Sequence, residues 1–166
     1  MPRDLTKKAL MILLDILMLS TMGFKERRYV EELRIVTKST ALDCIIDDTY
    51  DRIIYVIKKG DMGFAIGKDG GNIKKLQRVL GKRIEMVEEN GEMAGFIENI
   101  FKPAHIENIL EDGESQKINI YVSSRSDLGI AIGKSGCNVE KARILIQKYF
   151  GKEIGEIIYP EGSENS

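Results

Sequence analysis

The residues best suited to chemistry lie in two glycine-rich stretches of this sequence. Residues 66–73 read Ile-Gly-Lys-Asp-Gly-Gly-Asn-Ile, and residues 132–139 read Ile-Gly-Lys-Ser-Gly-Cys-Asn-Val. Each stretch holds a Gly-x-x-Gly loop, and a helix-period pattern follows it. Glycine lets the backbone approach another molecule without a Cβ in the way, and the free N–H groups of a helix N-terminus attract anions. The pattern therefore predicts that each loop holds a phosphate group.

The two loops belong to an internal repeat. Residues 54–75 and 120–141, which are 66 positions apart, share 12 of 22 residues. A solenoid needs about three repeats or more, so this duplication indicates two copies of one small domain. A single Gly-x-x-Gly is met by chance in many proteins, whereas two copies in matching surroundings are a specific signal.

The charges follow the same division. The chain has 166 residues and a net charge of −1, but this balance conceals three bands. Residues 58–83 carry eight basic and two acidic side chains, residues 84–116 one basic and nine acidic, and residues 117–152 seven basic and two acidic. Charge runs are usually solvated helix faces. Because both basic bands coincide with a Gly-x-x-Gly loop, we interpret them as surfaces that face phosphate.

Cysteine and histidine are too scarce for several kinds of site. Cys44 and Cys137 are the only cysteines, and His105 is the only histidine. One chain therefore cannot build a four-ligand Cys/His zinc site, and we expect no histidine-based triad, no metal and no cofactor. Two cysteines indicate reduced thiols in a cytoplasmic protein, not a disulfide framework.

Residues 1–25 stand apart from the repeat. Residues 9–19 are almost wholly apolar, but the run is too short for a membrane span and Asp15 interrupts it. No small-x-small cleavage site follows, as a signal peptide would require. We interpret the segment as an extra helix that packs on the domain or as a non-native start, with Met22 as a candidate first residue. We expect no membrane association.

Hydrophobic periodicity predicts the elements that position the first loop. They are a helix (26–36), two strands (41–47 and 52–59), a helical turn (61–66), a helix after the loop that ends at Leu80, and a strand (82–88). Asp61 is expected to cap the helical turn. Gly81 is expected to end the helix after the loop in the left-handed conformation, and Gly151 is expected to cap the corresponding helix of the second copy.

The second copy repeats this order. Its elements are a helix (96–101), two strands (104–110 and 117–123), a helical turn (127–132), a helix (139–150) and a strand (153–159). Three strands with helices on one face predict an α+β two-layer domain. We place the first domain at residues 26–90 and the second at 91–159. Residues 160–166 are expected to be a disordered tail.

These features resemble the KH domain, whose signature is Ile-Gly-x-x-Gly followed three residues later by an aliphatic residue. Ile66 to Ile73 and Ile132 to Val139 match it. A helix and a strand ahead of the core resemble the prokaryotic, type II arrangement. The sequence is also similar to the archaeal NusA-like transcription factors, short chains of two type II KH domains. Segments that look like that family are 43–48, 58–63, 65–68 and 102–104, and the resemblance covers roughly residues 24–159.

The resemblance implies an RNA-binding factor in transcription elongation or termination. It implies that single-stranded RNA is held by the loop N–H groups, by Lys68 and Lys134, and by an apolar floor that includes Ile66 and Ile132. Asp69 is expected to oppose phosphate. The RNA-binding residues implied are Ile66, Gly67, Lys68, Asp69, Gly70, Asn72, Lys75, Ile132, Gly133, Lys134, Ser135, Gly136, Asn138 and Lys141. A monomer in the cytoplasm is expected.

The sequence leaves two other functions open. An enzyme could hold a nucleotide phosphate on these loops, although neither loop has the Gly-Lys-Ser/Thr ending of a P-loop. A tandem-KH interaction or scaffold protein in RNA processing or ribosome assembly is the second reading. Contact with RNA polymerase is also open, because no segment resembles the polymerase-binding or OB-fold domain of bacterial NusA.

Overall fold

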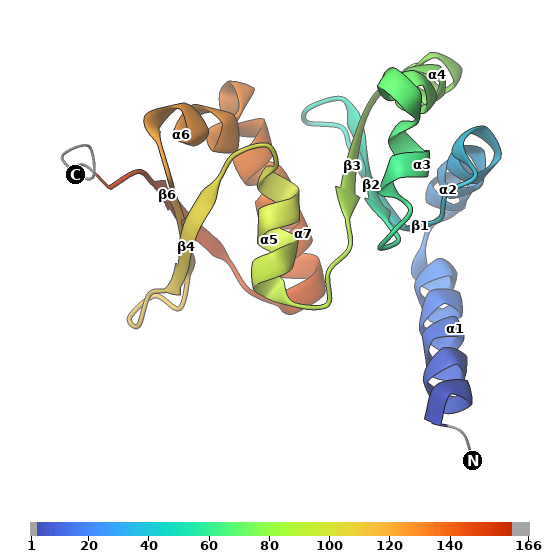
Figure 1. Ribbon diagram of the computed structural model, residues 1–166, viewed down its shortest axis with the longest axis horizontal. Coiled ribbons are helices and arrows are strands. Elements are labelled where there is room, and N and C mark those ends of the chain that lie inside the picture. Colours follow the sequence, from blue (N-terminus) through green and yellow to red (C-terminus); the bar gives the residue numbers. More distant parts are fainter. Residues whose placement is uncertain (1–2, 161–166) are drawn as a thin grey trace. The chain divides into compact units, whose positions relative to one another are not determined.

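A computed structural model of the chain describes residues 3–160 (Figure 1). Residues up to Glu89 form one compact unit, and residues from Asn90 onward form a second. Each unit is an α+β domain with a three-stranded sheet, as the sequence predicts. The disordered tail was predicted at residues 160–166, of which 161–166 lie outside the described residues.

The first unit contains four helices and three strands among its described residues. In chain order they are α1 (Arg3–Thr21), α2 (Phe24–Thr37), β1 (Ala41–Asp47), β2 (Arg52–Ile57), α3 (Met62–Ile66), α4 (Gly71–Leu80) and β3 (Arg83–Glu88). Strand β2 is central, pairing antiparallel with β1 and parallel with β3. The parallel pair arises because α3 and α4 form a crossover between β2 and β3.

The core of the first unit lies between the sheet and helices α2 and α4. Ile53 and Tyr55 of β2 pack with Leu33 of α2 and Leu76 of α4, and Leu33 and Leu76 are fully buried. The Tyr55 hydroxyl donates a hydrogen bond to the Tyr29 carbonyl at 2.8 Å. Burial raises the pKa of Tyr55, so this hydroxyl keeps its proton and continues to donate.

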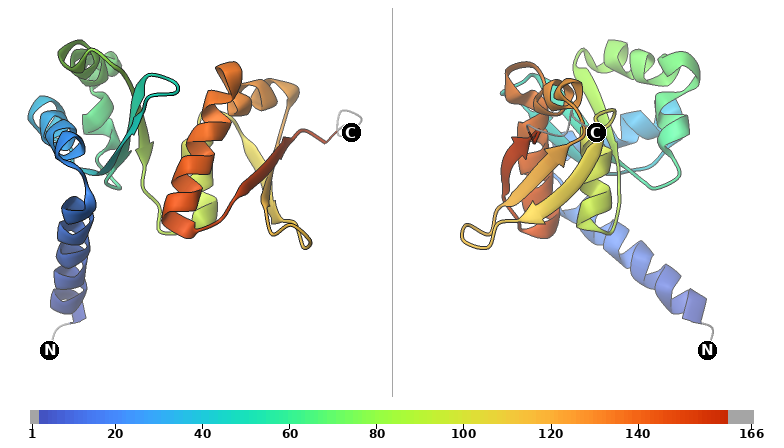
Figure 2. Two further views of the ribbon diagram at one scale, coloured as in Figure 1. Left: turned by 180° about the vertical axis from the view of Figure 1, so that it is seen from behind. Right: turned by 60° about the vertical axis from the view of Figure 1, so that its left-hand side comes forward.

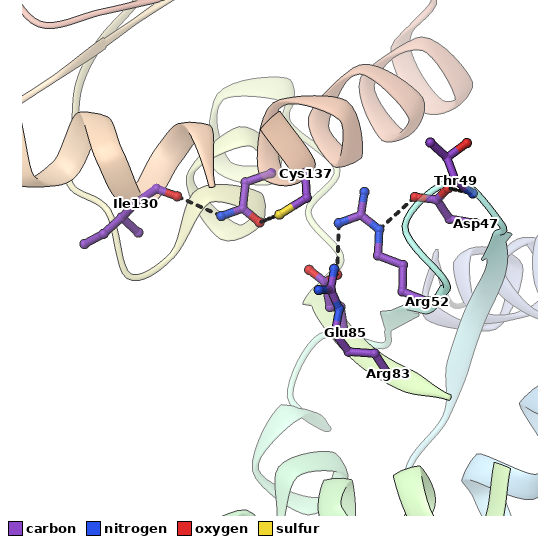
Figure 3. A network of polar contacts seen from close by, with 8 residues as sticks. Asp47, Thr49, Arg52, Arg83, Glu85, Ile130 and Cys137 are labelled. Atoms are coloured by element: carbon purple, nitrogen blue, oxygen red, sulfur yellow. Dashed lines mark hydrogen bonds and ion pairs between the residues drawn. The ribbon is translucent and has the colours of Figure 1, made fainter. Parts of the chain in front are cut away.

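A buried arginine links the three strands of this sheet (Figure 3). The Arg52 side chain is fully buried, and its guanidinium donates to Asp47 at 2.7 Å and to Glu85 at 2.9 Å. Burial opposes its charge, yet the hydrogen bonds to the two carboxylates hold the pKa of Arg52 above its ordinary value. The network joins β2 to β1 and to β3, and removing one partner of such a buried pair typically costs about 3–5 kcal/mol.

The second unit repeats the arrangement. Its elements are α5 (Met93–Phe101), β4 (Ile106–Glu111), β5 (Ile118–Val122), α6 (Arg125–Ile132), α7 (Cys137–Phe150) and β6 (Ile154–Ile158). Strand β5 is central, antiparallel to β4 and parallel to β6. The repeat places Ile118 where the first unit has Arg52, so the buried arginine network has no counterpart at that position.

Aromatic packing joins α5 to α7 within the second unit, and Figure 2 shows these two helices side by side. The Phe96 ring meets the Tyr149 ring edge-on at 5.5 Å between centroids and lies 6.1 Å from the Phe150 ring. Helix α7 ends as predicted, at Gly151 in the left-handed conformation, and α4 ends in the same way at Gly81. The two stops fix where β3 and β6 begin.

Helix α1 forms, but its apolar side chains do not pack as expected. Leu10, Leu13 and Leu17 are 56%, 61% and 58% exposed. The expected extra helix is therefore present, whereas burial of these leucines on the domain is not observed. Within residues 3–160, no helix has both the length and the apolar character needed to cross a membrane.

Candidate nucleic-acid interface

The first Gly-x-x-Gly loop joins α3 to α4 through an abrupt change of backbone direction. Helix α3 ends at Ile66, and Gly67 has φ 74° and ψ 172°. A short 3-10 turn, Lys68–Gly70, follows before α4 begins. Asp69 has φ 54° and Gly70 has φ 72°, both in the left-handed region. The chain therefore changes direction within a short loop. Lys68 and Asp69 lie at the tip of this loop, and both are exposed.

The second loop has the same backbone geometry. Gly133 has φ 74° and ψ 172°, Ser135 has φ 56°, and Gly136 has φ 78°. The two loops differ in sequence at their third position and in the residue after the second glycine, yet they follow the same path. The shared residues, rather than the variable ones, therefore set the conformation of the loop.

The first glycine of each loop is required by space as well as by φ. A Cβ added at Gly67 would lie 2.7 Å from Asn72, and one at Gly133 would lie 2.8 Å from Asn138. Real Cβ atoms do not approach other atoms this closely, and the positive φ would add strain for any other residue. Each loop is thus closed tightly against an asparagine in the first turn of the next helix.

The side chain of that asparagine stabilises the loop through a hydrogen bond. Asn72 Nδ2 donates to the Phe64 carbonyl at 2.7 Å, and Asn138 Nδ2 donates to the Ile130 carbonyl at the same distance. Figure 3 shows the second of these contacts as the dashed line at Ile130. These carbonyls lie in the last turn of α3 and α6, where helices leave acceptors unsatisfied. The amide groups predicted to contact RNA therefore also connect the two helices that flank each loop.

The lysines of the predicted site differ in exposure. Lys68, Lys134 and Lys75 are exposed, and they can reach a phosphate from solvent. Lys141, the counterpart of Lys75 in the repeat, is only 7% exposed. The structure thus brings the loop lysines to the surface in both units but buries the helix lysine in the second.

Charge around the loops is asymmetric. In the first unit, the Lys74 ammonium donates to the Asp69 backbone carbonyl at 3.3 Å, which places a positive charge against the loop. In the second unit the repeat has Glu140 at this position, and Glu140 pairs with Arg143 at 3.2 Å. The first loop therefore combines a carboxylate at its tip with a nearby ammonium, whereas the second loop has the neutral Ser135 at its tip.

Aspartates secure the helix before each loop, and their role was missed from the sequence. Asp61 occupies the N-cap position of α3 as predicted, but its side chain makes no cap hydrogen bond and instead accepts the Thr40 N–H at 2.9 Å. Asp127 accepts the His105 N–H at 3.1 Å and the Ser124 hydroxyl at 2.8 Å. These hydrogen bonds, that from His105 first, hold the pKa of Asp127 below its usual range. The matching positions of Asp61 and Asp127 in the repeat were the available signal.

Apolar side chains flank both loops at the surface. Ile66 and Ile132, the predicted floor residues, are 39% and 38% exposed. Phe64 is 65% exposed and its counterpart Ile130 is 37% exposed, although neither was anticipated. Both units therefore present two partly solvated hydrophobic side chains close to the loop.

A cleft of about 950 Å³ lies in the second unit beyond its loop. It is bounded by α7, β6 and the turn between β4 and β5, and its walls include Glu140, Arg143, Lys117 and Glu156. Glu140 is in the first turn of α7, so the cleft starts next to the loop. Side chains of both signs line it, which supplies donors and acceptors without a strong net charge.

Metal ligands are not gathered near these loops. Among residues 3–160, no group of three or more histidine, cysteine, aspartate or glutamate side chains is arranged to hold a metal ion. Cys44 and Cys137 are both buried, and neither forms a disulfide bond. The loops themselves offer backbone N–H donors and exposed lysine side chains.

Comparisons with known proteins agree with this geometry. A family model for the KH domain matches residues 26–91, and one for the NusA-like second KH domain matches residues 93–154. Halobacterium salinarum has a "Probable transcription termination protein NusA" that is 33% identical over 124 residues, covering 75% of this chain and 88% of that protein. The protein of the same name from Halococcus morrhuae is 32% identical over 123 residues, covering 74% and 87%.

A solved structure is also similar to this chain. The crystal structure of APE1850 superposes with a TM-score of 0.69 and is 35% identical, covering 84% of this chain and all of that chain. Seven curated proteins match significantly, and one of them is a small ribosomal subunit protein uS3 from Nitratiruptor, 33% identical over 73 residues. That match covers 44% of this chain and 31% of the ribosomal protein.

Proposed function

Because this chain belongs to the archaeal NusA-like family of proteins with two KH domains, we propose that it binds single-stranded RNA during transcription. Its relatives are named as probable transcription termination proteins, and we propose a role in elongation or termination for this chain as well. Each Gly-x-x-Gly loop holds a stretch of RNA backbone, and a KH loop accommodates about four nucleotides.

The observation that carries this proposal is the identical closure of the two loops. Gly67 and Gly133 have the same φ and ψ, and Asn72 and Asn138 make the same 2.7 Å hydrogen bond. Two copies of one preorganised turn, each opening a helix of ten residues or more, support a backbone-binding role. A preorganised site binds more tightly because less ordering is needed when the ligand arrives.

The binding step follows from the groups at each loop. Phosphate oxygens accept hydrogen bonds from the backbone N–H groups at the start of α4 or α7, and the helix dipole favours their negative charge. The ammonium of Lys68 or Lys134 adds a charge-assisted hydrogen bond at the loop tip. The bases then lie against Ile66 or Ile132, and in the second unit they enter the cleft beside α7. Lys75 extends the positive surface in the first unit alone, because its counterpart is buried.

The wider setting of this activity is part of the same proposal. We place the protein in the cytoplasm as a monomer, and two buried cysteines without a disulfide bond are consistent with a reducing compartment. RNA polymerase is a proposed partner through surfaces other than the loops. Phosphate binding by N–H groups and lysines requires no catalytic step, and we assign none.

A titration of labelled single-stranded RNA against salt concentration tests the proposal. Taking about 0.7 per neutralised phosphate on single strands, we expect log K to fall against log salt with a slope of roughly −2 to −4. An RNA duplex of the same length serves as the control. It should bind more weakly, because neither strand of a duplex can enter a loop on its own. Absence of RNA binding at low salt, or release of phosphate from ATP by the protein, would overturn the assignment in favour of a scaffold or an enzyme.

A further inference from the structure

An exposed aromatic ring stands beside the first loop. Phe64 lies in the middle of α3 and is 65% exposed, although burial of a phenylalanine side chain would be favourable. Its neighbour Ala65 is fully buried and anchors α3 to the core. The ring is therefore held at the surface by a helix that cannot rotate it inward without exposing Ala65.

The backbone of Phe64 is part of the loop closure. Its carbonyl accepts the 2.7 Å hydrogen bond from Asn72 Nδ2, and Asn72 lies in the first turn of α4. The N–H groups of that same turn are the ones assigned to phosphate. The backbone of Phe64 is thus fixed next to the phosphate position. The Phe64 ring therefore lies within reach of a neighbouring nucleotide.

The surroundings of the ring are open and basic. A Cβ built at Gly60 or at Gly63, which precede Phe64 in the chain, would meet no atom within 4 Å, so the space beside the backbone at these positions is open. Lys58 and Lys59, just before α3, are both exposed. Lys58, Lys59 and Lys68 thus lie on both sides of Phe64 in the chain, and their charges favour a negatively charged polymer over a basic peptide.

A lone exposed hydrophobic residue is normal on protein surfaces, so exposure alone carries no conclusion. Phe24 is even more exposed, at 89%, but it begins α2, a helix that neither precedes nor follows a Gly-x-x-Gly loop in the chain. Position 64 differs because the second unit also keeps an exposed apolar residue, Ile130, at the equivalent place, and the Ile130 carbonyl accepts the equivalent hydrogen bond. The repeat thus retains a solvated hydrophobic side chain at this point of the loop closure.

We propose that the Phe64 ring stacks on the base of a nucleotide next to the one whose phosphate the first loop holds. This inference rests on the proposed RNA binding and adds a base contact to it. Ile130 offers only an aliphatic contact, so the two units bind RNA differently. The first unit compensates for the carboxylate of Asp69 with stacking, and the second relies more on its phosphate contacts. Every base has a flat face, so the stack is tolerant of sequence.

Affinity measurements on variants of the full chain test the stack. Phe64→Ala should weaken binding of a short single-stranded RNA by about 5- to 150-fold, the range of one base–aromatic stack. Phe64→Trp should retain binding, and Phe64→Leu, which keeps apolar area, should still lose most of it. Ile130→Phe should tighten binding by creating a second stack. Phe24→Ala is the matched control and should bind as the unaltered chain does.

A fluorescent base reports stacking directly. RNA carrying 2-aminopurine should lose fluorescence on binding to the unaltered chain, and the loss should be smaller with Phe64→Leu at saturating protein. All variants should keep the thermal transition of the unaltered chain, because the altered side chains are exposed. Normal affinity and normal quenching with both Phe64→Ala and Phe64→Leu would overturn the stack while leaving the phosphate clamp intact. If the unaltered chain binds no RNA, the proposed function and this inference both fail.

Discussion

A substitution at Asp69 tests the electrostatic account of the loops with a minimal change to one side chain. Asp69→Asn removes the negative charge and keeps the size of the side chain. It also suits the backbone, because asparagine tolerates the left-handed conformation that Asp69 adopts at φ 54°. Serine occupies the same place in the second loop, but it is a less conservative replacement for Asp69 in the left-handed conformation. We expect Asp69→Asn to tighten RNA binding.

The size of the effect follows from the geometry of the tip. Two unit charges about 5 Å apart interact by about 0.8 kcal/mol in water, and ordinary salt screens this further. The Lys74 ammonium, 3.3 Å from the Asp69 carbonyl oxygen, already offsets part of the repulsion. We therefore expect a gain of about 0.5 kcal/mol and at most about 1 kcal/mol, which is roughly a 2- to 5-fold increase in affinity. Ser135→Asp should loosen binding by a similar factor.

Fluorescence anisotropy with one short single-stranded RNA at fixed salt is a suitable assay. The gain should shrink when the salt concentration is raised, because the interaction is exposed to solvent. Glu98→Gln is the matched control, since it removes one exposed carboxylate from α5, away from the loops in the sequence. Weaker binding by Asp69→Asn would show that the carboxylate contacts RNA or stabilises the loop, and the repulsion argument would then be wrong.

Three further outcomes are expected. Asn72→Ala with Asn138→Ala removes hydrogen bonds worth about 0.5–1.5 kcal/mol each, so RNA affinity should fall and hydrogen exchange at both loops should accelerate; unchanged exchange would contradict the closure. Asp127 has a folded-state pKa below its ordinary 3.8, so it stabilises the fold above that pH and loses this effect as the pH falls. Asp127→Asn should therefore lower the melting temperature at pH 7, and the difference from the unaltered chain should shrink as the pH falls below 3.8; a difference that does not change with pH would contradict the assignment. Deleting residues 1–21 should leave cooperative melting intact, because the described apolar side chains of α1 are half exposed; loss of cooperativity would show that α1 stabilises the first unit.

Local signals predicted the repeated elements well. Hydrophobic periodicity located the strands and helices, and the glycines at 81 and 151 marked where the helices end. The repeat identified both Gly-x-x-Gly loops, because matched glycines, lysines and asparagines recur at one spacing. Each of these features depends on residues close together in the chain, which is why the sequence alone was sufficient.

Long-range partners could not be predicted in the same way. The carboxylate of Asp61 looked like a helix cap, but the structure pairs it with Thr40, 21 residues earlier. Arg52 reaches Glu85 across 33 residues, and no local pattern indicates that contact. Lys75 and Lys141 match in the repeat, yet only Lys141 is buried, since exposure depends on how the whole unit packs around the longer helix α7.

The loop lysines test the central claim most directly. Lys68→Asp combined with Lys134→Asp reverses the charge at both loop tips, where the side chains are exposed and the fold should be unaffected. The decisive measurement is the affinity of this double variant for single-stranded RNA, alongside its thermal melt. The account predicts at least a tenfold loss of affinity, roughly the value of one charge-assisted hydrogen bond, with the melting transition unchanged. Unchanged affinity in a folded double variant would contradict the assignment of both loops as phosphate clamps.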